Sequence, residues 1–255
     1  MKTLRKLNRR WDIIALASFV PLLVIGYIFT GISIALRSHD KAEHVVSTSF
    51  DISQVGHKLV FNAKGQGSSN LYLLNLQTWK VTRLTDTPNT ELYPVFTSDG
   101  QSVVYTESKP GHDESWIMSL ALATGKTRRL TFPVSPYSDR MPACSRDGTH
   151  IAFSRAALTP VYGFGGAGTN GWDLYTMKID GSDIRRVTST RYYNLSAPVY
   201  NVNDRTLFFC AIPFDDSEVT GHLFSVSADG SGTPAMLDPA NSARKRASIP
   251  PESAQ

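Results

Sequence analysis

The sequence predicts an all-β protein: a small or incomplete β-propeller of about four four-stranded antiparallel blades, preceded by one transmembrane helix. Three observations predict it. A closing motif recurs as TRLT at residues 82–85, RRLT at 128–131 and RRVT at 185–188. A turn followed five positions later by an aromatic residue also recurs along the chain. An uncharged stretch of 24 residues precedes all of these repeats.

Composition and charge limit the classes of protein that this chain can be. A chain of 255 residues with 41% hydrophobic content can bury a substantial core. The net charge is +4, but +5 comes from residues 1–10 and +2 from residues 244–252, so the segment between them is mildly acidic, about −3. A nucleic-acid-binding domain needs its excess cations on the folded body. We therefore expect no nucleic-acid partner.

Residues 13–36 carry no charged side chain and predict a transmembrane helix that acts as a signal anchor. Its length of about 36 Å exceeds the bilayer's hydrocarbon thickness of about 30 Å. The basic residues 1–12 precede it and a mixed linker, residues 37–44, follows. The positive-inside rule therefore places the N-terminus in the cytoplasm and the body outside it. A cleaved signal peptide is the alternative, since Ser33-Ile34-Ala35 resembles a cleavage site.

The body, residues 45–238, contains four copies of one unit. The recurring aromatic residues Phe61, Tyr105, Phe153 and Phe209 mark the second strand of each unit, and the two repeated elements recur every 44 to 57 residues. Asp-Gly and Thr-Gly pairs separate short apolar runs and fit tight hairpin turns, which need positive φ angles. A repeated unit of four short antiparallel strands is typical of a propeller blade. The proline-rich basic tail, residues 239–255, is expected to be disordered.

Two stretches carry a resemblance to a known family. Residues 94–100, PVFTSDG, and Asp173-Leu174-Tyr175, together with the closing R-R-L-T, resemble the repeats of the TolB family and of related WD-like bacterial propellers, including the N-terminal propeller of dipeptidyl-peptidase-IV-like enzymes. The resemblance covers about residues 45–237. It implies a periplasmic setting and binding to other envelope proteins. The chain departs from TolB, which has an additional N-terminal α/β domain and six blades.

Four blades raise the question of how the ring closes. An open arc leaves edge strands unpaired. Residues 50–52 and 235–237 are the candidate closing strands of a closed or nearly closed monomer, the arrangement that we favour. Self-association, or another chain that completes the ring, is the alternative.

The glycine-rich stretch GFGGAGTNG, residues 163–171, contains a G-x-G-x-x-G match. A phosphate-binding loop of this type must lead into a helix. The following residues, Trp172-Asp173-Leu174-Tyr175, predict a strand, so we expect no phosphate site and no cofactor. In a meander, this stretch becomes the longest second turn of a blade, and we interpret it as a flap at the end of the propeller where the long connections gather.

The end with the long connections is the candidate binding surface, because binding groups concentrate on loops held by a rigid scaffold. Its mixture of aromatic, arginine and acidic residues suits contacts with protein or carbohydrate. Glu91 and Asp139 each precede a strand-opening proline by three residues and should approach the mouth of the channel. The candidate residues are Glu91, Tyr93, His112, Asp113, Glu114, Tyr137, Asp139, Arg140, Tyr162, Tyr192, Tyr193, Asp215, Asp216, Glu218 and His222.

Two enzymatic alternatives depend on motifs that can be sought in the sequence. The chain contains no G-x-S-x-G nucleophile elbow, so the hydrolase part of propeller peptidases is absent from it. A metal-dependent enzyme could use His112 and His222 with Asp113 or Asp215, but no close histidine spacing fixes two ligands together. Cys144 and Cys210 lie in strand-like runs and are expected to be free buried thiols, with a disulfide as the less favoured alternative.

The sequence therefore favours a membrane-anchored, extracytoplasmic, non-catalytic module that binds or scaffolds envelope proteins. A propeller-based metal-dependent enzyme acting on carbohydrate or peptide, or an accessory propeller of a peptidase system, remains the alternative.

Overall fold

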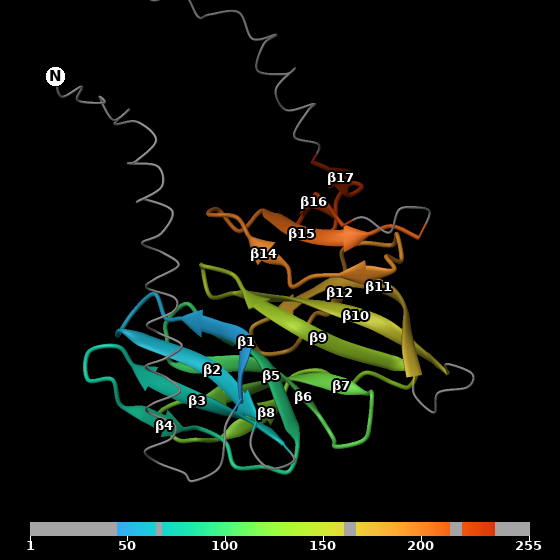
Figure 1. Ribbon diagram of the computed structural model, residues 1–255. Helices are drawn as coiled ribbons and strands as arrows, with labels where there is room; N and C mark the ends of the chain where they lie inside the picture. The colour runs from blue at the N-terminus through green and yellow to red at the C-terminus, as the bar shows by residue number, and fades with distance from the viewer. Residues whose placement is uncertain (1–44, 65–67, 161–166, 215–220, 238–255) are drawn as a thin grey trace, which may run out of the picture.

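The computed structural model describes residues 45–64, 68–160, 167–214 and 221–237, and its regular structure there consists of β-strands (Figure 1). Within these ranges no helix is long and apolar enough to cross a membrane. The predicted basic segment, transmembrane helix, linker and C-terminal tail lie outside the described residues.

The strands form four antiparallel sheets that follow one another along the chain, which confirms the predicted all-β class (Figure 1). Each sheet is a meander of strands adjacent in sequence, except that β13 and β14 both pair with β15. Blades 1 and 2 comprise β1 (Val45–Ile52), β2 (Lys58–Lys64), β3 (Ser69–Asn75), β4 (Val81–Arg83), β5 (Thr90–Phe96), β6 (Ser102–Ser108), β7 (Ser115–Ala121) and β8 (Thr127–Arg129). Blades 3 and 4 comprise β9 (Tyr137–Cys144), β10 (His150–Pro160), β11 (Ala167–Lys178), β12 (Arg185–Arg186), β13 (Asn194–Leu195), β14 (Val199–Tyr200), β15 (Thr206–Ile212), β16 (His222–Ser227) and β17 (Ala235–Met236).

The sheets are arranged as the blades of a propeller. The first strand of each later blade lies against the preceding blade: β5 contacts β1 to β3, β9 contacts β5 to β7, and β13 and β14 contact β11 and β9. The first strands of all four blades therefore surround one axis. A cavity of about 330 Å³ on this axis is lined by residues of all four, among them Ile52, Phe96, Cys144 and Val199.

The recurring aromatic residue explains how neighbouring blades pack. Tyr105 of blade 2 is buried in one cluster with Val60 and Leu71 of blade 1, and Phe153 of blade 3 shares a cluster with Val104 and Ile117 of blade 2. Because side chains alternate between the two faces of a strand, this ring lies on the face that packs against the preceding blade. The aromatic repeat seen in the sequence is thus the repeat of the inter-blade core.

The ring is open between blades 4 and 1 in the described part of the chain. Strand contacts join blade 1 to blade 2, blade 2 to blade 3 and blade 3 to blade 4. Among the described strands, no comparable contact joins β13 to β17 of blade 4 to β1 to β4 of blade 1. The two candidate closing segments do not pair with each other, because Phe50 to Ile52 pair with β2 and Ala235–Met236 pairs with β16. Blade 4 exposes Val199 and Leu223 on the sheet face directed away from blade 3. The described strands of blades 4 and 1 thus do not close the ring by strand pairing, although residues of both blades line the central cavity.

The first and third turns of each blade, such as residues 97–101 and 122–126 of blade 2, are tight and lie at the same end of the propeller, as the sequence predicts. Gly181 shows why a glycine is needed in these turns: its φ is +84°, and a Cβ atom there would lie 2.8 Å from the carbonyl oxygen of Leu130 in the preceding blade. The carboxylate of Asp204 joins two such turns by accepting hydrogen bonds from the backbone amides of Arg146 and Asp147, at 2.8 and 2.9 Å.

The glycine-rich stretch leads into strand β11 and not into a helix, which confirms that it is not a phosphate loop of the helix-opening kind. The predicted long turn is corrected, however, because β10 and β11 stay paired as far as Pro160 and Ala167. Most of the expected loop is therefore an extension of the hairpin. Residues 161–166, where the flap was expected, lie outside the described residues.

Candidate binding surface

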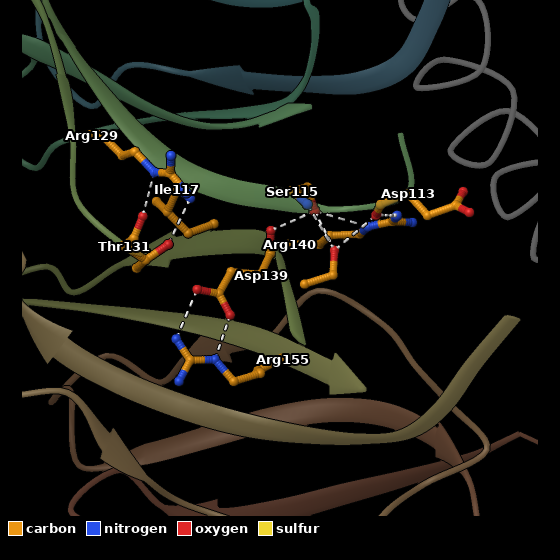
Figure 2. Close-up of polar contacts among 9 residues, drawn as sticks. Asp113, Ser115, Ile117, Arg129, Thr131, Asp139, Arg140 and Arg155 are labelled. Atoms are coloured by element: carbon orange, nitrogen blue, oxygen red, sulfur yellow. Dashed lines mark hydrogen bonds and ion pairs between the residues drawn. The ribbon is translucent and has the colours of Figure 1, made fainter. Parts of the chain in front are cut away.

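The closing motif of blades 1 to 3 has a structural role. The hydroxyl oxygen of Thr131 accepts a hydrogen bond from the backbone amide of Ile117 at 3.0 Å, and Arg129 Nε donates to the Thr131 carbonyl at 2.8 Å (Figure 2). The same pairs recur in blades 1 and 3, with matching distances. The motif therefore fixes the outermost strand to its neighbour, and the threonine satisfies an amide that the short strand leaves unpaired.

Glu91 is fully buried in β5, and not displayed at the channel mouth as the sequence predicted. Its carboxylate accepts hydrogen bonds from the hydroxyls of Thr85 and, at 2.7 Å, Thr87. Burial raises the pKa of Glu91 above its ordinary value, the two hydroxyl bonds oppose the rise, and the neighbouring charge of Glu107 adds to it. Glu91 thus ties the link between blades 1 and 2 to the core.

We expect Glu91→Gln to be at least as stable as the wild type at pH 7. Because the pKa of Glu91 is raised on folding, its protonated form favours the native state below the ordinary value of 4.5, and this stabilisation is lost as pH rises through the folded pKa. Urea unfolding at pH 4 and pH 7 checks this prediction. The free energy of unfolding of the variant, relative to that of the wild type, should be higher at pH 7 than at pH 4. The exposed Glu114→Gln is the control. A variant clearly weaker than wild type at pH 7 would contradict the prediction.

Asp139 is also buried, which corrects its expected exposure. Its two carboxylate oxygens accept bonds from Arg155 Nε and Nη2, at 2.5 and 2.8 Å, in a bidentate pair between β9 and β10 (Figure 2). Such a fork fixes both side chains in one plane. The pair therefore holds the inner edge of blade 3.

A second polar network joins blade 2 to blade 3 (Figure 2). The hydroxyls of Ser115 and Ser138 lie 2.7 Å apart, and Arg140 donates from Nε to the Ser115 hydroxyl at 3.1 Å and from Nη2 to the Asp113 carbonyl at 2.8 Å. These bonds position the β6–β7 connection, on which His112 and Asp113 are exposed. Tyr137 is the first residue of β9 in blade 3, and it is 45% exposed.

The two neighbouring tyrosines that follow the blade 3 motif have different environments. Tyr192 is only 1% exposed and packs on Phe209 and Phe224 with ring centroids 5.5 and 5.3 Å apart, so its predicted place on the surface is corrected to a place in the core. Tyr193 is 54% exposed and meets Phe214 edge-on at 5.9 Å. Phe214 was not among the predicted residues; its signal in the sequence is an apolar side chain inside a polar connection.

The remaining predicted residues are spread over the same end. Tyr93 is half-buried at a bulge in β5, where its φ of +54° turns the chain. His222 is half-buried at the start of β16. Arg140 is half-buried as well. The predicted residues that are exposed are thus His112, Asp113, Glu114, Tyr137 and Tyr193, while Tyr162, Asp215, Asp216 and Glu218 lie outside the described residues.

Both cysteines are free thiols. Burial raises the pKa of Cys144 to about 12, so it is inert at neutral pH. Cys210 is exposed, which corrects its predicted burial. Over the ranges that the structure describes, no three His, Cys, Asp or Glu side chains are grouped so as to hold a metal ion.

Part of the chain is similar in sequence to a known protein. No family model matches the chain. A Tol-Pal system protein TolB from Francisella tularensis subsp. holarctica is 32% identical over 98 residues, which make up 38% of this chain and 22% of that protein. The chain therefore matches about a fifth of the length of this relative.

Solved structures show the same fold. The putative TolB from Agrobacterium tumefaciens has a TM-score of 0.59 at 20% identity, covering 78% of this chain and 67% of that one. TolB from Acinetobacter baumannii has a TM-score of 0.55 at 19% identity, covering 76% and 44%. An oligogalacturonate lyase from Vibrio parahaemolyticus has a TM-score of 0.57 at 19% identity, covering 74% and 53%. The repeats, the blade packing and these similarities together show that the described part of the chain has a β-propeller fold similar to that of TolB.

Proposed function

We propose that this chain is a membrane-anchored, extracytoplasmic propeller that binds an envelope protein without catalysing a reaction. Residues 13–36 anchor it with the N-terminus in the cytoplasm, and the end with the long connections makes the contact. The observation that carries the proposal is the sequence similarity to the TolB of a Tol-Pal system, joined to a propeller of the same fold.

The accessible residues at this end support a protein partner. Tyr193 and Phe214 form an aromatic pair in which each ring is about half exposed, at 54% and 53%. Aromatic residues and arginine are enriched where protein interfaces gain most of their binding energy. Arg140 keeps the β6–β7 connection in place, so His112 and Asp113 are presented on a fixed backbone. A partner that spans this end would thus meet aromatic anchors at blade 4 and a preorganised polar loop on blade 2.

Site-specific photo-crosslinking in native membranes tests this function. With a photoreactive amino acid at Tyr193 or Tyr137 of the full-length chain, we expect the same discrete adduct from both positions. Val202, which is 78% exposed in a tight turn at the opposite end, is the matched control and should give none. The double change Tyr193→Ala and Phe214→Ala should weaken the adduct formed from Tyr137 at least tenfold while changing stability by about 1 kcal/mol or less.

Equal adducts from both ends of the propeller, or none from Tyr193 and Tyr137, would overturn the proposal. Metal analysis of the purified chain discriminates the enzymatic alternative, which requires a tightly bound divalent ion. Alkaline extraction of membranes tests the anchor separately, since a spanning helix resists it and a peripheral protein does not.

A further inference from the structure

The arginine of the closing motif has a carboxylate partner in two blades. In blade 1, Arg83 pairs with Asp86 three residues later, at 2.6 Å. In blade 3, Arg186 pairs with Asp173 of β11, at 2.5 Å. The repeat thus offers two acidic positions, one after the motif and one on the third strand, and each of these blades uses one of them.

Blade 2 has an aromatic residue at both positions. Phe132 follows Arg129 by three residues, where blade 1 has Asp86. Trp116 directly precedes Ile117, whose amide binds the motif threonine just as that of Leu174 does in blade 3, so Trp116 stands where blade 3 has Asp173. The guanidinium of Arg129 lies 4.1 Å from the Trp116 ring centroid and 4.9 Å from that of Phe132.

Ring contacts leave the edge of this guanidinium available. Rings attract a guanidinium through its face, whereas carboxylates bind in its plane. Arg129 Nε donates to Thr131, and neither terminal nitrogen has a carboxylate within ion-pair distance among the described residues. The nearby acids are otherwise engaged or exposed: Glu107 accepts a bond from Trp116 Nε1 at 3.1 Å, Asp139 binds Arg155, and Glu114 faces solvent.

Arg129 lines a groove of about 680 Å³ between the outer strand of blade 2 and the face of blade 3. Arg128, on the same wall, donates from Nη1 to the Asp180 carbonyl at 2.8 Å and keeps its charge at the rim. Two apolar side chains of the lining, Phe132 and Ile184, are 68% and 40% exposed. Positive charge and apolar surface are therefore adjacent in one concave site, and the carboxylate of Asp180 in its lining accepts hydrogen bonds from the amide and hydroxyl of Ser182.

We propose that this groove binds an acidic peptide segment of a protein partner, with one carboxylate held by the terminal nitrogens of Arg129. An apolar side chain next to that carboxylate packs on Phe132 and Ile184, which favours a peptide over a polar uronic-acid sugar. The site lies on the flank of the propeller and does not depend on the surface at the end with the long connections.

Isothermal titration of the full-length chain with acetyl-Gly-Leu-Glu-Leu-Glu-Leu-Gly-amide tests the proposal, with the Gln-for-Glu peptide as the control ligand. We expect binding of the acidic peptide only. Arg129→Met should abolish it, and Arg129→Lys should weaken it about tenfold, because an ammonium group lacks the planar fork. Phe132→Asp should also weaken peptide binding about tenfold or more, because the new carboxylate can pair with Arg129 as Asp86 pairs with Arg83 in blade 1.

Phe132→Asn is the matched comparison: it removes the same ring without adding a charge, so it loses only the apolar contact and should weaken binding clearly less than Phe132→Asp does. The exposure of residue 132 keeps this comparison valid even if Arg129→Met fails to fold. Equal binding of the two peptides, equal binding by Phe132→Asp and Phe132→Asn, or competition by inorganic phosphate or oligogalacturonate as strong as by the peptide would overturn the proposal.

Discussion

Phe153→Ala is expected to lower the free energy of unfolding by about 3–5 kcal/mol, the usual range for removing a buried phenylalanine. Phe153 has no exposed surface and stacks on Tyr175 with ring centroids 5.8 Å apart. It also lies in the cluster that contains Val104 and Ile117 of the preceding blade. The change leaves a cavity between two blades, and backbone fixed by sheet hydrogen bonds can collapse into it only partly.

Chemical unfolding followed by far-ultraviolet circular dichroism measures this loss. Phe132→Ala is the matched control: Phe132 is 68% exposed, so we expect a loss of less than about 1 kcal/mol. Similar losses for the two variants would show that the recurring aromatic residue does not form the inter-blade core. The same substitution at Phe209, which is 2% exposed, should resemble that at Phe153.

Asp139→Ala is expected to cost about 3 kcal/mol or more. The side chain of Asp139 is fully buried, and that of its partner Arg155 is 18% exposed. Removing the carboxylate leaves a guanidinium with little access to water, and an unpaired buried charge is strongly destabilising. Arg155 lies 4.8 Å from the Tyr175 ring centroid, and this contact offsets only part of the loss.

A double-mutant cycle isolates the pair. Asp139→Ala with Arg155→Met should recover most of the lost stability, because no unpaired charge remains. The exposed pair of Arg185 and Asp183, 2.9 Å apart, supplies the matched control, and Asp183→Ala should cost about 0–1 kcal/mol. A double variant as unstable as the sum of its single changes would mean that Asp139 and Arg155 act independently.

The sequence was most informative where a local pattern repeats. The spacing of the motif threonines and of the aromatic residues predicted four units, and the turn dipeptides predicted which connections are tight. Thr131 and Arg129 make the same hydrogen bonds as their counterparts in blades 1 and 3, because the strand geometry repeats with the sequence motif. Gly181 likewise belongs to a turn that the sequence predicts, whereas its close approach to Leu130 is visible only in the structure.

The candidate site was less predictable, because exposure depends on neighbours distant in the sequence. Glu91, Asp139 and Tyr192 look like loop residues, yet the first is bound by threonine hydroxyls, the second by Arg155 and the third by two phenylalanine rings. Tyr193, adjacent to Tyr192, remains exposed. Two adjacent residues thus differ in burial because one side chain faces the neighbouring blade and the other does not.

The sequence by itself determined the strand class, the repeat and the position of the turns, because these follow from short-range periodicity and from the φ angles that particular residues adopt. Only the tertiary structure decided that the described strands of blades 4 and 1 do not pair, that the buried carboxylates are structural, and that Arg129 faces rings where its counterparts face acids. These features depend on which side chains from separate blades meet, and a linear pattern does not encode those distances.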